Sequence, residues 1–182
     1  LNSTLLRGSG RNYGVSVMVQ KSSGKLTGWM SYTYTKARRT FNADRMRGSY
    51  PASHERPHEL NMVATYAPWR HFDFCATLVW ASGTPFTAPV SVNIINGNIM
   101  AKYGRHNANR YADYMRLDLS ANFKWTSPGG TEHGFNLSVC NATAHKNELF
   151  YRLRISTKNE YAYRPMYFVL PVLPSVSYYC RF

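Results

Sequence analysis

The stretch that decides the fold runs from Met115 to Trp125 and reads Met-Arg-Leu-Asp-Leu-Ser-Ala-Asn-Phe-Lys-Trp. Side chains of a β-strand point alternately to the two faces of its sheet. One face of this strand would hold Met115, Leu117, Leu119, Ala121, Phe123 and Trp125, and the other would hold Arg116, Asp118, Ser120, Asn122 and Lys124. In a soluble sandwich the apolar face would cover a core. In a membrane barrel it would face lipid, while the polar face lines an aqueous lumen.

The same alternation of apolar and polar residues recurs along the chain. It predicts further strands at 13–20, 26–35, 58–67, 72–82, 134–140 and 176–182, with a resumption of the sixth strand at 149–155. Short turns are predicted at 21–25, 68–71 and 127–130, and longer connections at 36–57, 83–113 and 156–163. Asn96-Gly97 predicts a local hairpin inside the second long connection. Short and long connections alternate, which is typical of an up-and-down meander with tight turns at one end.

Charge and aromatic content indicate the kind of partner. The chain of 182 residues has a formal charge of +13 and contains 14 Tyr, and a basic protein of this kind attracts nucleic acid or a phosphate-bearing membrane surface. The cations gather in the long connections rather than on one strand face, which favours lipid phosphates over nucleic acid. We therefore expect contacts to lipopolysaccharide or to an acidic substrate from the loop residues Arg38, Arg39, Arg45, Arg47, Arg105 and Arg110.

The sequence contains no recognisable catalytic or metal-binding pattern. It has neither a G-x-S-x-G nor an H-E-x-x-H motif, and its carboxylates are few and scattered. The histidines and the three cysteines are not spaced as metal ligands. No apolar run is long enough for a transmembrane helix. We expect no enzyme activity, no metal and no cofactor.

The predicted strand faces favour a membrane barrel. At the positions of the predicted strands, no Lys, Arg, Asp or Glu falls on the proposed lipid face, where a cation at the midplane would cost about 2 to 4 kcal/mol. The fold class that follows is all-β, an antiparallel up-and-down meander of about seven long strands that forms part of a large transmembrane β-barrel. A passive porin or another outer-membrane barrel is one alternative. A soluble β-sandwich that binds glycans or nucleic acid is the other.

Several motifs, in this order, carry a resemblance to a known family. They are Lys21-Ser22-Ser23-Gly24-Lys25-Leu26-Thr27-Gly28-Trp29, Arg56-Pro57-His58-Glu59-Leu60, Ser82-Gly83-Thr84-Pro85, Asp113-Tyr114-Met115-Arg116-Leu117-Asp118-Leu119-Ser120 and Leu137-Ser138-Val139-Cys140-Asn141. With them, the chain resembles the C-terminal part of the barrel of TonB-dependent outer-membrane receptors, in particular the Bacteroidetes SusC- and RagA-like type. The closing segment from Leu173 to Phe182 resembles the last strand of that family.

The resemblance implies that residues 1–182 are the C-terminal portion of a barrel whose plug and N-terminal strands are absent from this sequence. It implies active uptake of a nutrient such as an iron chelate, cobalamin, a glycan or a peptide across the cell outer membrane. The implied partners are outer-membrane lipid, the TonB complex acting through the missing part, the barrel-assembly machinery and a surface lipoprotein. The final strand, through Tyr178 and Phe182, would be the assembly signal, and Arg116, Asp118, Asn122 and Lys124 would face the lumen and could contact the plug. A cross-strand ladder is the plainer expectation for these four residues.

Overall fold

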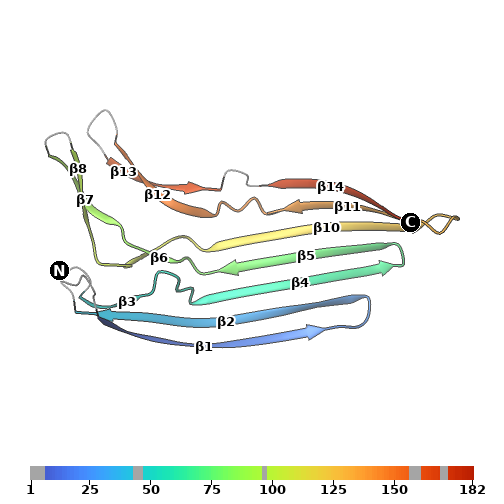
Figure 1. Cartoon of the computed structure of the whole chain (residues 1–182), viewed down its shortest axis with the longest axis horizontal. Coiled ribbons are helices and arrows are strands. Elements are labelled where there is room, and N and C mark those ends of the chain that lie inside the picture. The colour runs from blue at the N-terminus through green and yellow to red at the C-terminus, as the bar shows by residue number, and fades with distance from the viewer. Residues whose placement is uncertain (1–6, 43–46, 96–97, 156–160, 169–171) are drawn as a thin grey trace.

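The computed structural model describes residues 7–42, 47–95, 98–155, 161–168 and 172–182. Its long strands are β1 (Gly8–Lys21), β2 (Leu26–Phe41), β4 (His58–Trp69), β5 (Phe72–Ala81), β10 (Tyr114–Thr126), β11 (Glu132–Cys140) and β14 (Leu173–Arg181). They pair antiparallel, each with the next long strand along the chain (Figure 1). The predicted all-β meander of about seven long strands is confirmed. The sheet is not closed into a barrel, because the path of paired strands ends at β1 on one side and at β14 on the other.

The strand registers join the predicted apolar faces into one continuous surface. Residues directly opposite each other in an antiparallel pair share a face. Leu119 lies opposite Ala76 on β5 and Val139 on β11, and Met62 on β4 lies opposite Met30 on β2. The same register holds across β1 and β14. The alternation read from the sequence therefore places apolar residues on one side of all seven strands, and we call this side the apolar face and its opposite the polar face.

No second layer covers the apolar face in the part of the chain that the structure describes. Phe74 and Leu119 are each 43% exposed and Tyr178 is 53% exposed, although all three lie well inside their strands. Among the described residues, the buried hydrophobic ones are Ala37, Ala52, Ala81 and Val92, and all four are small. The described residues thus form a single-layered sheet without a conventional hydrophobic core.

The two ends of the sheet differ, as the alternating connections predict. The end we call the turn end carries the connections β1–β2, β4–β5 and β10–β11 together with the C-terminus (Figure 1). The opposite end, the loop end, carries the short strands β3 (Gly48–Pro51), β6 (Pro85–Phe86), β7 (Pro89–Ile95), β8 (Asn98–Tyr103), β9 (Asn109–Arg110), β12 (Glu148–Ile155) and β13 (Tyr161–Tyr167). In the predicted Asn-Gly hairpin, Ile95 lies opposite Asn98, while residues 96–97 fall outside the described residues.

Two segments differ from the sequence-based prediction. The connection 36–57 was expected to be irregular, but β2 extends to Phe41 and pairs with β3. Residues 149–155 were expected to continue the sixth strand in the main sheet. Instead β12 pairs with β13 in a separate two-stranded sheet, so that this part of the prediction is wrong.

The interruption before β12 has a clear physical cause. After Cys140 the chain leaves the ladder at Asn141, which has a positive φ of 53°, a conformation that Asn tolerates better than most residues. The Asn147 side chain then takes the place of a strand neighbour: its Nδ2 donates to the Met115 carbonyl at 2.9 Å, and its Oδ1 accepts from the Met115 N–H at 2.9 Å. The Asn147 amide thus satisfies the backbone hydrogen-bonding groups of Met115 on β10, at a point where no backbone strand continues beside them.

Candidate functional site

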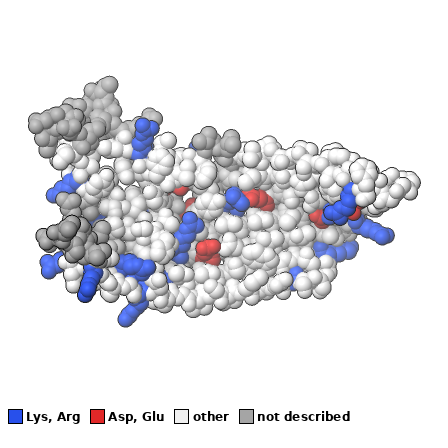
Figure 2. Space-filling model, in the orientation of Figure 1, with Lys and Arg blue, Asp and Glu red and all other residues white. Residues whose placement is uncertain are grey.

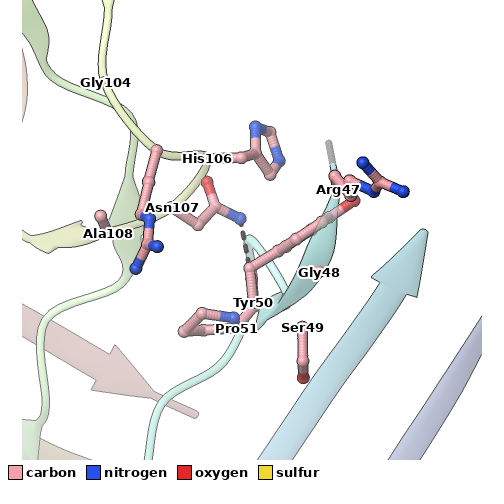
Figure 3. Close-up of a pocket in the computed structure, with 10 residues that line it drawn as sticks. Arg47, Gly48, Ser49, Tyr50, Pro51, Gly104, His106, Asn107 and Ala108 are labelled. Carbon is pink, nitrogen blue, oxygen red and sulfur yellow. Dashed lines mark hydrogen bonds between the residues drawn. The ribbon is translucent and has the colours of Figure 1, made fainter. Parts of the chain in front are cut away.

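A polar pocket lies at the loop end, between β3 and the loop at 104–108. It encloses about 530 Å³ and is lined by Arg47, Gly48, Ser49, Tyr50, Pro51, Gly104, Arg105, His106, Asn107 and Ala108 (Figure 3). We call it the basic pocket. Its two walls come from segments more than fifty residues apart in the sequence, so that only the fold brings them together.

Asn107 fastens the two walls of the basic pocket to each other. Its side chain is buried, and its Nδ2 donates to the Pro51 carbonyl at 2.8 Å and to Ser53 Oγ at 3.2 Å. Its own N–H donates to Thr87 Oγ1 at 3.0 Å. The backbone at Asn107 has a positive φ of 52°. Two of these hydrogen bonds hold the 104–108 loop against Pro51 of β3 and against Ser53 just after it, and the third ties the loop to Thr87.

The lining of the basic pocket is cationic. It includes Arg47, Arg105 and His106 and no Asp or Glu. The His106 ring meets the Tyr50 ring edge-on, with centroids 4.5 Å apart, and in Figure 3 His106 extends from its loop towards β3, where Arg47 begins the strand. Tyr50 lies opposite Arg39 on β2, which belongs to the polar face. The basic pocket therefore opens on the polar side of the sheet.

A buried ion pair supports the wall beside the basic pocket. Glu55 is 3% exposed, and one of its carboxylate oxygens pairs with the Arg110 guanidinium while the other accepts from the Ala37 N–H at 3.0 Å. Arg110 also donates to the Gly83 carbonyl at 3.0 Å. Gly83 is required here because a Cβ would collide with the Tyr111 carbonyl oxygen. Arg110 was predicted as an external contact residue, and its guanidinium is instead held by neighbours in the chain.

The other predicted basic residues lie on different surfaces. Arg38 stands on the apolar side, opposite Arg11 of β1, and Arg39 on the polar side donates to Asn12 Oδ1 at 2.7 Å. Arg47 and Arg105 both line the basic pocket. Arg45 lies outside the described residues. Figure 2 shows blue side chains gathered at the loop end and a second group at the turn end, so that the cations are less confined to one end than the sequence suggested.

The four predicted lumen residues lie on the polar face and bind their neighbours in the sheet. Asn122 donates to Asp73 at 2.6 Å and accepts from Asn136 at 2.6 Å. Lys124 pairs with Asp73 at 3.2 Å, and Arg116 pairs with Asp118 at 3.0 Å. Cross-strand contacts of the expected kind are therefore present at Asn122 and Lys124, whereas the Arg116–Asp118 pair lies within β10.

The two residues predicted as an assembly signal lie at the turn end of the chain. The Tyr178 hydroxyl is 2.7 Å from His133 Nδ1, and its ring packs against Phe135 with centroids 5.3 Å apart. Phe182 is fully exposed. Tyr178 is therefore one of the apolar-face aromatics of β14, while its role in assembly stays a prediction.

Sequence reasoning missed an aromatic cluster at the loop end. Phe86, Tyr111, Tyr151 and Tyr163 come from four separate segments, and the Phe86 ring lies 4.5 Å from that of Tyr111 and 5.0 Å from that of Tyr151. The rings of Tyr151 and Tyr163 are stacked at 5.2 Å. Burial, together with the Glu148 carboxylate, raises the pKa of the Tyr151 hydroxyl. The cluster joins the β12–β13 hairpin to β6. Its residues are far apart in the sequence, so that no local pattern predicts it.

Within residues that the structure describes, no helix is long and apolar enough to cross a membrane, and no group of His, Cys, Asp and Glu side chains is arranged to hold a metal ion. The chain matches no known family model, no curated protein and no solved structure.

Proposed function

We propose that this chain is a segment of the wall of a large outer-membrane β-barrel that takes up a nutrient. The observation that carries the proposal is the apolar face, which runs across seven strands and is covered by no described residue of a second layer. The polar face carries hydrogen-bonded Asn, Asp and Lys side chains. Exposed apolar surface of this extent is typical of contact with lipid or with another protein. Lipid contact accounts for both faces at once.

The dimensions of the sheet support this proposal. β10 has 13 residues, about 43 Å at roughly 3.3 Å per residue. A membrane-spanning strand tilted by about 45° needs about 9 to 11 residues. The seven strands are therefore long enough to cross a hydrocarbon layer. The unpaired outer edges of β1 and β14 cannot stand in lipid, and in our proposal further strands of the same polypeptide pair with them and close the barrel.

The ends of the apolar face also support a membrane position. At the loop end, Tyr13 lies opposite Lys36 and Arg11 lies opposite Arg38, all on the apolar side. Two cations directly opposite each other on one face repel unless an anion lies between them. Phosphates of outer-membrane lipid or lipopolysaccharide, at the level of the loop end, would supply that anion. The resemblance noted in the sequence adds active, TonB-dependent uptake to this proposal.

The environment of two tryptophans tests the proposal. Trp80 lies on the apolar face, opposite Leu60 and Met115, and Trp29 lies on the polar face, opposite Val63. The full polypeptide is placed in vesicles whose lipid acyl chains carry bromine, which quenches nearby tryptophans. We expect bromine to quench a smaller fraction of the tryptophan emission in Trp80→Phe than in the unchanged protein, and an unreduced fraction in Trp29→Phe. Fluorescence quenching on reconstituted protein measures this. Equal effects of the two substitutions, or quenching carried by Trp29, would refute a lipid-facing apolar side.

A further inference from the structure

We propose that the basic pocket binds a small phosphate-bearing solute. The proposal rests on the proposed function in one respect, namely that the polar face is the aqueous side of the wall. It names the substrate class that the mouth of the barrel would capture, a soluble anion of two or more negative charges.

The basic pocket offers two guanidinium groups to an anion. Arg39 and Arg110 each have an acceptor in the chain, Asn12 and Glu55 respectively. Arg47 and Arg105 have no carboxylate partner among the described residues, and the nearby Glu55 is already paired with Arg110. Guanidinium groups bind phosphate and carboxylate through paired N–H donors. Arg47, Arg105 and His106 all line the basic pocket, and a phosphoryl group offers such donors more negative oxygens than a single carboxylate does.

The size and position of the basic pocket favour a solute over a lipid headgroup. A volume of about 530 Å³ lies within the range of roughly 300 to 1,000 Å³ common for small-ligand sites. The pocket is on the side of Tyr50, which faces away from the apolar face. Lipid phosphates would be reached by Arg11, Lys36 and Arg38, which lie on the other side of β1 and β2.

The basic pocket is held open before a ligand arrives. Asn107 links the loop that carries Arg105 and His106 to the strand that carries Tyr50 and Pro51. A site whose walls are already fixed loses less conformational freedom when it binds. Asn107 is thus a positioning residue.

The test measures binding of inorganic pyrophosphate to the full polypeptide in detergent micelles by titration calorimetry. We expect the variant R47Q/R105Q to bind at least tenfold more weakly than the unchanged protein. The matched control K25Q/R70Q removes the same charge at the turn end and should bind within twofold of the unchanged protein.

The variant Asn107→Ala tests the positioning role. It keeps both guanidiniums and should still bind pyrophosphate threefold or more weakly. Circular dichroism melting checks that each variant is folded. If R47Q/R105Q fails to fold, the single variants R47Q and R105Q, each expected to lose threefold or more, replace it.

Two outcomes would overturn the inference. One is equal pyrophosphate affinity in R47Q/R105Q and K25Q/R70Q. The other is an R47Q/R105Q protein that binds pyrophosphate as the unchanged protein does but no longer binds lipopolysaccharide-containing vesicles. That result would assign the two arginines to lipid. Failure of the proposed function is seen separately, because tryptophan quenching by brominated lipid does not depend on the pocket. Quenching as expected without pyrophosphate binding would leave the wall function standing and refute the solute site alone.

Discussion

Leu119→Arg is expected to prevent stable insertion of the polypeptide into the outer membrane. Leu119 lies near the middle of β10 on the apolar face, beside Ala76 and Val139. A cation at the midplane of a lipid-facing strand costs about 2 to 4 kcal/mol, which is a large share of the stability of a typical domain. The protein recovered in urea-washed outer membranes should fall at least tenfold, measured by immunoblot against a membrane marker.

Ser120→Arg is the matched control, because it places the same side chain one residue along the strand on the polar face. Ser120 lies between Cys75 and Ser138, and an aqueous lumen can hydrate its guanidinium. We expect membrane recovery within twofold of the unchanged protein. Equal recovery of Leu119→Arg and Ser120→Arg would contradict a lipid-facing apolar side. So would full recovery of a folded Leu119→Arg protein from the soluble fraction.

Arg110→Met is expected to destabilise the loop end by about 3 kcal/mol, the lower part of the range for breaking a buried ion pair. The substitution leaves the Glu55 carboxylate buried and without its cation, where the Ala37 N–H still donates to it at 3.0 Å. Arg110 itself is 35% exposed, which places the effect at the lower end. The urea midpoint of the membrane-inserted protein, followed by tryptophan emission, measures the change.

Arg56→Met serves as the control for this substitution. Arg56 is exposed and lies next to Glu55, so that its replacement removes the same charge from the same region. Its effect should stay within about 0.5 kcal/mol, as for ordinary surface changes. The double variant Glu55→Gln with Arg110→Met should be more stable than Arg110→Met alone, because no buried charge is left. A double variant that is less stable by the sum of the two single effects would show that the pair is not coupled.

The long strands could be predicted from the sequence because their information is local. Alternation along β10 fixes which of its residues share a face, and the short turns at 21–25, 68–71 and 127–130 each fix one antiparallel pair. The basic pocket could not be predicted, because it needs β3 and the 104–108 loop to lie side by side. That arrangement follows from the pairing of β3 with β2 and from the hydrogen bonds of Asn107. The position of β12 was missed for a related reason, since one asparagine side chain replaces a strand neighbour there.

At Asn147 a side chain takes the place of a backbone neighbour of β10. As a result, the β12–β13 hairpin and the seven-stranded sheet can unfold separately. The ladder of β11 ends at Cys140, and the hairpin of β12 and β13 has its own closed set of backbone hydrogen bonds. Unfolding of this hairpin breaks the amide contacts to Met115 and the ring contacts of Tyr151, but no pairing between long strands. The amide protons of the hairpin therefore have a route to exchange with solvent that leaves the seven-stranded wall intact.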